Sequence, residues 1–163
     1  MQLVQNASKE KLRGGFYTPK PITNFILKWA FNGNQNFDIL EPSVGDGKFL
    51  EQIRENSFAY NSITAIEINE VEAEKARNLN LPKTVVITGD FFQFCNNTEK
   101  RFSLAIGNPP YIRYQFFDRD QRVEAEKIFA KVGLRYSKLT NPWVPFVVGS
   151  SLLLKEKGKL GFV

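Results

Sequence analysis

The chain has 163 residues, of which 42% are hydrophobic and 13% aromatic, so it fits one domain with a buried core and not a disordered chain. With no histidine and a single cysteine, Cys95, it excludes an internal disulfide, a cysteine-rich zinc site and histidine-based acid–base catalysis. A net charge of +5 is mildly basic and suits a polyanionic partner. No apolar run is long enough to span a membrane and the first residues are polar, so we expect a cytoplasmic protein with no membrane partner.

A helix is predicted ahead of the first strand, because apolar side chains recur there at helical spacing. These side chains are Ile22, Phe25, Ile26 and Trp29. Thr18 is predicted to cap this helix, with Pro19 in its first position.

Four short runs, apolar and often β-branched, are typical of parallel strands that are covered on both faces. They comprise residues 37–41, 62–67, 84–88 and 103–107. Helices are predicted between them over residues 46–58 and 69–79. This alternation predicts an α/β fold with a doubly wound, mostly parallel, Rossmann-like sheet, whose ligands lie at the carboxyl ends of the strands.

The segment 111–141 follows the fourth strand and is predicted to be a loop plus a helix over residues 120–132. A further helix is predicted from Asn141-Pro142 to about Lys155, and Lys157-Gly158 then turns the chain into a fifth strand at residues 159–163. Because the chain stops at that strand, we expect residues 1–163 to form one domain that is truncated at its C-terminus.

The loop after the first strand carries Glu41-Pro42-Ser43-Val44-Gly45-Asp46-Gly47. A nucleotide-type ligand is expected at this place, but Glu41 and Asp46 would repel a pyrophosphate. A P-loop is excluded because Phe49 stands where that motif needs Ser or Thr. A phosphate-free ligand with cationic groups fits better, and S-adenosylmethionine carries a sulfonium and an ammonium. The alternative interpretation is an acidic surface turn between strand and helix.

Two further acids end the next two strands. Glu67 follows the glycine loop by about 20 residues, where an acid accepts hydrogen bonds from ribose hydroxyls. Asp90 is placed to accept from an adenine amino group, and Ile68 with Phe91 or Phe92 could sandwich the adenine ring. A solvated glutamate and ordinary core packing are the alternatives for these residues, but three successive strands that each deliver an acid favour the cofactor site.

A stiff turn, Asn108-Pro109-Pro110-Tyr111, follows the fourth strand. The Asn108 side chain and the Pro109 carbonyl form a pair of acceptors for both N–H bonds of an exocyclic amine, whose lone pair is then aimed at a methyl sulfonium. Catalysis would depend on orientation and not on a strong base. Tyr111 would stack on a base flipped out of duplex DNA. The alternative is a rigid proline turn with a packed tyrosine.

These motifs resemble the amino-methyltransferase family, in its adenine-specific branch with the Asn-Pro-Pro-Tyr motif. The resemblance implies N6-adenine DNA methylation with S-adenosylmethionine, in a bacterial or archaeal restriction-modification or phage-defence system. It assigns cofactor contacts to Tyr17, Thr18, Glu41, Pro42, Ser43, Gly45, Asp46, Gly47, Glu67, Ile68, Asp90, Phe91, Asn108 and Phe146. It assigns catalysis to Asn108, Pro109, Pro110 and Tyr111, with Tyr111 and Arg113 contacting the nucleic acid. Arg119, Arg122 and Lys131 are further candidates for phosphate contacts.

Double-stranded DNA is the partner that the resemblance implies, and family members also carry a separate target-recognition domain or specificity subunit. Protein-glutamine and RNA methyltransferases share the Asn-Pro-Pro-Tyr motif and are alternative assignments. The Gly15-Phe16-Tyr17-Thr18-Pro19 element upstream of the cofactor loop favours DNA over both. A non-catalytic cofactor-binding scaffold is a third alternative, which the intact Asn108–Tyr111 motif disfavours.

Overall fold

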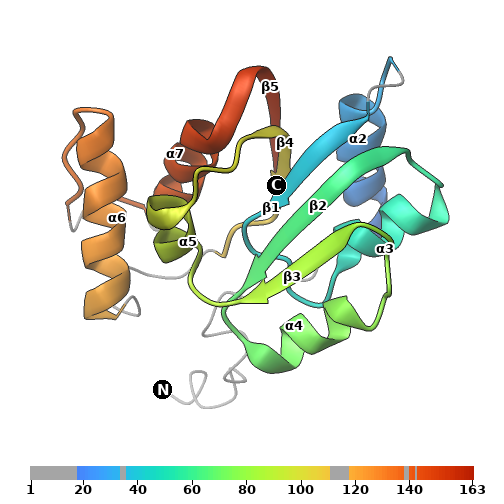
Figure 1. Ribbon diagram of the computed structural model, residues 1–163, viewed down its shortest axis with the longest axis horizontal. Coiled ribbons are helices and arrows are strands. Elements are labelled where there is room, and N and C mark those ends of the chain that lie inside the picture. Colours follow the sequence, from blue (N-terminus) through green and yellow to red (C-terminus); the bar gives the residue numbers. More distant parts are fainter. Residues whose placement is uncertain (1–17, 34–35, 111–117, 138–139, 142) are drawn as a thin grey trace, which may run out of the picture.

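A computed structural model describes residues 18–33, 36–110, 118–137, 140–141 and 143–163 (Figure 1). Its centre is a five-stranded sheet in the order β3-β2-β1-β4-β5, in which every neighbouring pair is parallel. The strands are β1 (Phe37–Glu41), β2 (Tyr60–Glu67), β3 (Thr84–Thr88), β4 (Phe102–Gly107) and β5 (Leu154–Phe162). The helices are α2 (Lys20–Ala30), α3 (Lys48–Glu55), α4 (Glu70–Arg77), α5 (Phe91–Asn97), α6 (Arg119–Lys131) and α7 (Val144–Leu153). The chain reverses its direction across the sheet between β1 and β4, and ligands of such folds bind at this switch point.

Helices cover both faces of the sheet and form two apolar cores. One core joins β1, β2 and β4 to α2, α3 and α4 and includes Leu27, Leu50 and Leu104, all fully buried. The other joins the sheet to α5, α6 and α7 and includes Phe92 and Ile128, also fully buried. Figure 1 shows α5, α6 and α7 together on one side of the molecule. These two layers of helices confirm the predicted doubly wound α/β fold.

The strand predictions agree closely with the structure. Strands β1 and β3 have the predicted bounds, and β2 and β4 begin two residues and one residue earlier than expected. Helices α3 and α4 lie inside the predicted ranges. Helix α5, of 7 residues, was not predicted. Its sequence, FFQFCNN, has apolar residues at helical spacing but is too short for the pattern to predict a helix, and its N-cap is Asp90, which the sequence had suggested only as a ligand.

The predicted apolar face of α2 is wrong except at Ile26, which is buried in the core. Ile22, Phe25 and Trp29 are 42%, 73% and 49% exposed, and the buried residues of α2 are Thr23, Ile26, Leu27 and Ala30. Both sets have the same helical spacing but differ by one position, which rotates the face by about 100°. The exposed side chains at positions 22, 25 and 29 are more hydrophobic than the buried set, which includes a threonine and an alanine. Thr23 is buried without an unmet polar group because its hydroxyl donates to the Pro19 carbonyl at 3.4 Å.

The cap predicted for the same helix is also wrong. Pro19, and not Thr18, is at the N-cap position, and no side chain makes a capping hydrogen bond there. Helix α2 therefore begins with a proline that sets the backbone dihedral, and its first N–H bonds come from Ile22 and Thr23 to the Pro19 carbonyl.

The region after β4 contains the predicted elements with shifted ends. Helix α6 begins one residue before and ends one residue before the predicted range, and Asp118 caps it. Helix α7 ends at Leu153, earlier than expected, and β5 already begins at Leu154. Lys157 has a φ of 61° inside β5, so the predicted turn at this point is a local bend within the strand.

Among the described residues, no helix is both long and apolar enough to cross a membrane.

Candidate active site

The carboxyl ends of β1, β2 and β3 bring the predicted acids to one edge of the sheet. Glu41 is the last residue of β1 and Glu67 the last residue of β2, and these strands are adjacent and in register, with Glu41 beside Ala65. Asp90 follows β3, the next strand outward. The fourth motif, Asn108-Pro109-Pro110, follows β4 on the other side of β1. The sheet order thus places the predicted cofactor loop of β1 between the ribose acid and the catalytic turn.

The loop between β1 and α3 depends on glycine. Gly45 and Gly47 have φ angles of 54° and 89°, which side chains with a Cβ rarely adopt. A Cβ on Gly47 would also lie only 2.6 Å from Leu79 Cδ1. The loop is fixed to β2 as well, because the Val44 N–H donates to the Ile66 carbonyl at 2.9 Å. These constraints hold the loop close to the ends of the strands.

Glu41 is the most deeply buried acid of the site. It is 1% exposed, and its Oε2 atom has no hydrogen-bond partner within the part of the chain that the structure describes. Burial, together with the neighbouring charges of Glu67 and Asp46, raises the pKa of Glu41 well above its usual range. A buried carboxyl without a partner is costly, so this position fits a cationic or hydrogen-bond-donating ligand.

Asp46 carries a second carboxyl of the same loop. Burial raises its pKa, although Lys48 Nζ, at 3.5 Å from Asp46 Oδ2, opposes that shift. The described residues include no group of three or more His, Cys, Asp and Glu side chains that could hold a metal ion.

Glu67 is held by backbone donors from two directions. Its Oε2 accepts from the Gly45 N–H and its Oε1 from the Asn69 N–H, both at 2.9 Å. Burial raises the pKa of Glu67, and these two N–H groups act in the opposite direction. Each carboxylate oxygen can still accept another hydrogen bond, which leaves room for the two hydroxyls of a ribose.

Asp90 combines two structural contacts. Its Oδ1 caps helix α5 by accepting from the Gln93 N–H at 2.9 Å, and its Oδ2 accepts from Gln121 Nε2 at 3.1 Å. Gln121 comes from α6, on the far side of the catalytic motif in the sequence. Gln121 was not predicted to contact this site, although the spacing of Asp118 and Gln121 is that of a helix capping box.

The apolar side chains predicted to contact adenine differ in exposure. Ile68 is 58% exposed next to Glu67 and offers a free surface for a planar ring. Phe91 and Phe146 are 3% and 8% exposed and stack on each other, with ring centroids 5.5 Å apart. Phe92, the alternative to Phe91, is fully buried. Their packing in the core explains their position, and a contact of Phe91 or Phe146 with the cofactor stays a prediction.

The predicted catalytic turn is joined to the predicted cofactor loop. Ser43 Oγ donates to the backbone carbonyl of Asn108 at 3.3 Å, across the boundary between β1 and β4. Gly107, the last residue of β4, has a φ of 155° and lies beside Pro42, since a Cβ there would make an ordinary contact with Pro42 Cδ at 3.6 Å. The structure therefore brings Ser43, Pro42 and Asn108 together, as the sequence predicts.

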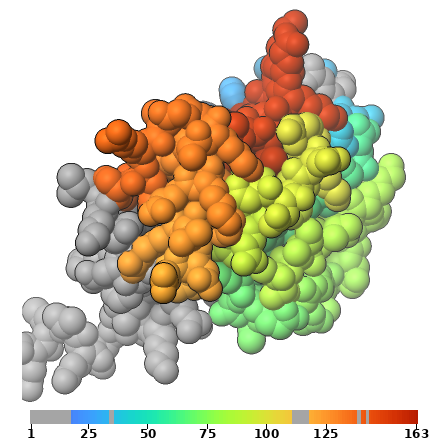
Figure 2. Space-filling view, turned by 60° about the vertical axis from the view of Figure 1, so that its left-hand side comes forward, coloured from blue at the N-terminus to red at the C-terminus, as the bar shows by residue number. Residues whose placement is uncertain are grey.

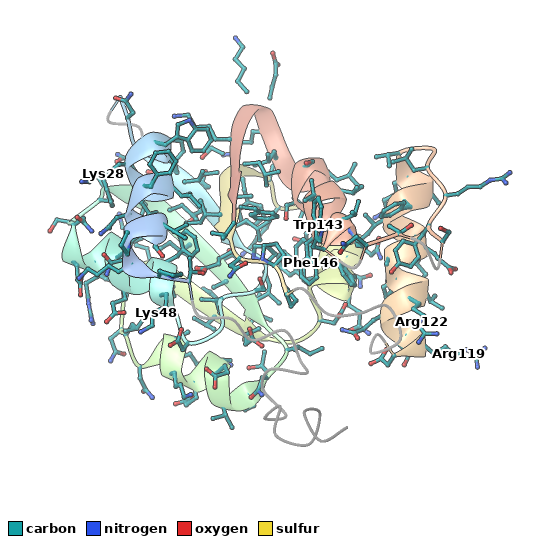
Figure 3. The ribbon with its side chains drawn as sticks, turned by 180° about the vertical axis from the view of Figure 1, so that it is seen from behind. Lys28, Lys48, Arg119, Arg122, Trp143 and Phe146 are labelled. Carbon is teal, nitrogen blue, oxygen red and sulfur yellow. The ribbon has the colours of Figure 1, made fainter. Side chains whose placement is uncertain are left out.

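Several predicted residues lie outside the described part of the chain, namely Tyr17, Tyr111 and Arg113. Thr18 is described and buried, at 7% exposure. Arg119 and Arg122 lie at the beginning of α6, where Arg119 points away from the body of the protein (Figure 3). Lys131 lies at the opposite end of the same helix and is exposed. The phosphate contacts assigned to these residues stay predictions.

Comparison with protein families finds one match over nearly the whole chain. Residues 15–163 match the family described as Eco57I restriction-modification methylase. The matched range contains every motif discussed above.

Several curated Type II methyltransferases are similar to this chain, and two of them serve as examples. The Type II methyltransferase M.CvrRI of Paramecium bursaria Chlorella virus XZ-6E is 35% identical over 64% of this chain and 26% of its own length. The Type II methyltransferase M.AccI of Acinetobacter calcoaceticus is 26% identical over 91% of this chain and 27% of its own length. The chain thus spans about a quarter of the length of these relatives.

Solved structures share the fold. A putative class I S-adenosylmethionine-dependent methyltransferase of Listeria monocytogenes has a TM-score of 0.62 at 16% identity, over 83% of this chain and 41% of its own. At that identity the likeness shows the architecture alone, and it agrees with the sheet described here.

Proposed function

Because this chain belongs to the Eco57I restriction-modification methylase family, we propose that it contributes the catalytic core for methyl transfer from S-adenosylmethionine to the N6 amine of an adenine in DNA. The predicted family is confirmed by this membership, and S-adenosylmethionine is the cofactor expected of a methylase with this fold. The proposal further includes the N6 amine as the target atom and a base that is flipped out of the duplex, and the residues of the site support both.

The single observation that carries the proposal is the contact between the two loops. Ser43 of the acidic loop holds the Asn108 backbone at 3.3 Å, so the predicted binding place of a methyl donor and the predicted acceptor of an amine are neighbours. A methyl transfer needs this proximity above all, because the reacting atoms must be aligned at a short distance.

The described residues fit S-adenosylmethionine. The cofactor supplies an electrophilic methyl group on a sulfonium, next to an ammonium and a carboxylate. Glu41, whose Oε2 lacks a partner in the described structure, would accept from the ammonium. Glu67 would accept from the ribose hydroxyls, and Asp90 from the adenine amino group. Ile68, exposed beside Glu67, would stack on the ring.

Asn108 and Pro109 would orient the target amine. The Asn108 side chain and the Pro109 carbonyl accept its two N–H bonds, which withdraws the nitrogen lone pair from the ring and directs it at the methyl group. The amine attacks directly and loses its proton afterwards, so no strong base is required. Because an amine inside a duplex is out of reach, the adenine must leave the stack, and Tyr111 is proposed to stack on it.

DNA is proposed as the substrate because the family is described by restriction-modification. The match covers only 26% and 27% of the length of these relatives, so we propose that the choice of DNA sequence depends on a target-recognition domain or specificity subunit. A cytoplasmic location in a bacterium or archaeon also stays a prediction.

The proposal is tested first by calorimetric titration of this protein with S-adenosylmethionine, followed by methyl transfer. The transfer assay uses the full-length gene product with unmethylated duplex DNA, an RNA of the same sequence and a glutamine-containing protein mixture. Saturable cofactor binding with N6-methyladenine formed in the DNA supports the proposal. Methylation of the RNA or the protein, and not of the DNA, contradicts the proposed substrate while leaving the cofactor site intact.

A further inference from the structure

The contact between Gln121 and Asp90 has no role in the reaction described so far. It joins α6, which follows the catalytic motif, to the acid proposed to recognise the cofactor's adenine. Figure 2 shows α6 in orange at the surface of the protein, beside the yellow segment that leads into β4. The hydrogen bond from Gln121 to Asp90 connects α6 to the edge of the sheet where the cofactor is proposed to bind.

The two neighbours of the Gln121 side chain fix its orientation. Its Oε1 accepts from the Asp118 N–H at 3.3 Å, and its Nε2 donates to Asp90 Oδ2 at 3.1 Å. The opposite orientation of the amide would place its oxygen against a carboxylate and its NH₂ against an N–H, with no bond to either. The Gln121 N–H also donates to Asp118 Oδ1 at 2.8 Å, which completes the capping box.

Asp90 is held at both oxygens as a result. Its Oδ1 is fixed by the Gln93 N–H at the start of α5, and its Oδ2 by Gln121 at the start of α6. A carboxylate with both oxygens engaged in this way has one orientation, and each oxygen still has a lone pair for a further donor. An amino group of a purine can supply that donor, whereas an oxo group at the same position cannot.

We propose that Gln121 is a positioning residue for Asp90, and that together they give the site its preference for a 6-aminopurine over a 6-oxopurine in the cofactor. This inference rests on the proposed function, which assigns the adenine contact to Asp90. It adds that the helix after the catalytic turn determines how strictly the cofactor ring is recognised.

The test compares the dissociation constants of S-adenosylhomocysteine and S-inosylhomocysteine by calorimetry at pH 8. The two compounds differ in the group at position 6 of the ring and in the proton that the 6-oxopurine carries at N1, so the change of preference between wild type and variants is what assigns the effect to Gln121. Gln121→Glu keeps the acceptor that caps α6 but, when ionised, has no proton to donate to Asp90. Gln121→Leu removes both contacts. Both variants are expected to lower the preference of the wild-type protein for the adenosyl compound about fivefold, the effect of one lost hydrogen bond.

Asn96→Ala is the matched control, because Asn96 forms another link between α5 and α6 through Glu124 Oε2 at 2.7 Å and does not contact Asp90. The Asn96→Ala variant is expected to prefer the adenosyl compound as strongly as the wild-type protein does. Thermal unfolding of each variant checks that it folds.

Three results would overturn the inference. The first is a loss of preference in Gln121→Leu but not in Gln121→Glu, which would assign the effect to capping of α6. The second is an equal loss in Asn96→Ala, which would assign the effect to the general anchoring of α6. The third is an unchanged preference in both Gln121 variants. Failure of the wild-type protein to bind S-adenosylhomocysteine contradicts the proposed cofactor site itself, and the inference falls with it. A wild-type protein that binds both compounds equally leaves the cofactor site standing but refutes the role of Asp90 and Gln121.

Discussion

The two halves of the proposed site hold their polar groups in different ways. At the end of β2, the side-chain carboxylate of Glu67 receives hydrogen bonds from the backbone N–H groups of Gly45 and Asn69. At the end of β4, the backbone itself is held, because Ser43 donates to the Asn108 carbonyl and two prolines restrict the turn. The cofactor half is thus arranged by side chains on a fixed loop, and the target half by a stiff main chain. Substitutions in the two halves should therefore separate binding from catalysis.

Asn108→Ala should have the largest effect. Methyl transfer by the full-length gene product is expected to fall by about two to three orders of magnitude, the loss on removing one positioned hydrogen-bonding group from a reacting centre. Cofactor affinity should be nearly unchanged, because the bond from Ser43 goes to the backbone of Asn108. Incorporation of labelled methyl groups into DNA and calorimetry measure the two quantities.

The control is Asn61→Ala, which removes an exposed asparagine whose side chain donates to the Asn36 carbonyl near the other end of the sheet. It should retain full activity. Normal turnover by Asn108→Ala would refute the proposed catalytic role of the turn.

Glu67→Ala should show the reverse pattern. Cofactor binding is expected to weaken by about 1–3 kcal/mol, the range for hydrogen bonds to a charged group. Turnover at saturating cofactor should change less than affinity does. Titration with S-adenosylmethionine measures the loss, and Glu70→Ala, an exposed acid paired with Arg77 on α4, is the control. An affinity equal to that of the wild type contradicts the ribose contact.

Gly47→Ala tests how rigidly the loop of the cofactor half is built. A Cβ at this position would be 2.6 Å from Leu79 Cδ1 on a backbone with a φ of 89°, so we expect a loss of about 1–3 kcal/mol in the free energy of unfolding. Gly45→Ala meets no atom within 4 Å and has only the backbone strain of its φ of 54°, so its loss should be smaller. Urea unfolding compares the two. Equal losses would mean that the contact with Leu79 is relieved by movement of that side chain.

Glu41→Gln should produce the finest difference, a change in how stability depends on pH. The folded-state pKa of Glu41 is raised above the ordinary 4.5, so the folded protein binds the proton more tightly than the unfolded chain. The stability contributed by the protonated carboxyl is complete below about pH 4.5 and is lost as the pH rises toward the raised pKa. Glu41→Gln should match the wild type near pH 4 and exceed its free energy of unfolding at pH 8. Urea unfolding at both pH values measures the free energy of unfolding of the two proteins. Equal values at pH 8 would show that the charge on the buried Glu41 carboxylate does not destabilise the folded protein.

The strands could be predicted from the sequence because they are short runs rich in apolar and β-branched residues. The bounds predicted at residues 37–41 and 84–88 agree with β1, which is mostly buried, and with β3, an edge strand in which Val85 is 54% exposed. The surface of α2 could not be predicted in the same way. Two overlapping stripes with helical spacing were available, and the less hydrophobic one, which contains Thr23 and Ala30, is the one that faces the core.

The part of the candidate site formed by the loop between β1 and α3 could be predicted, because its residues are adjacent in the sequence. Glu41, Gly45 and Gly47 stand together in the sequence, and the structure brings them to the expected edge. Gln121 was not predictable as part of the site, since its partner Asp90 lies 31 residues away and only the packing of α6 on α5 brings them together. The burial of Phe91 against Phe146 depends on tertiary packing for the same reason.

Under the proposed function, the bond from Ser43 to the Asn108 carbonyl has a consequence for how the site can change during evolution. A backbone carbonyl is present whatever residue occupies position 108, so the link between donor loop and acceptor turn does not depend on the asparagine side chain. A mutation that alters the chemistry at position 108 can be sampled without disturbing that alignment. The geometry of transfer and the identity of the recipient group can therefore diversify independently of each other.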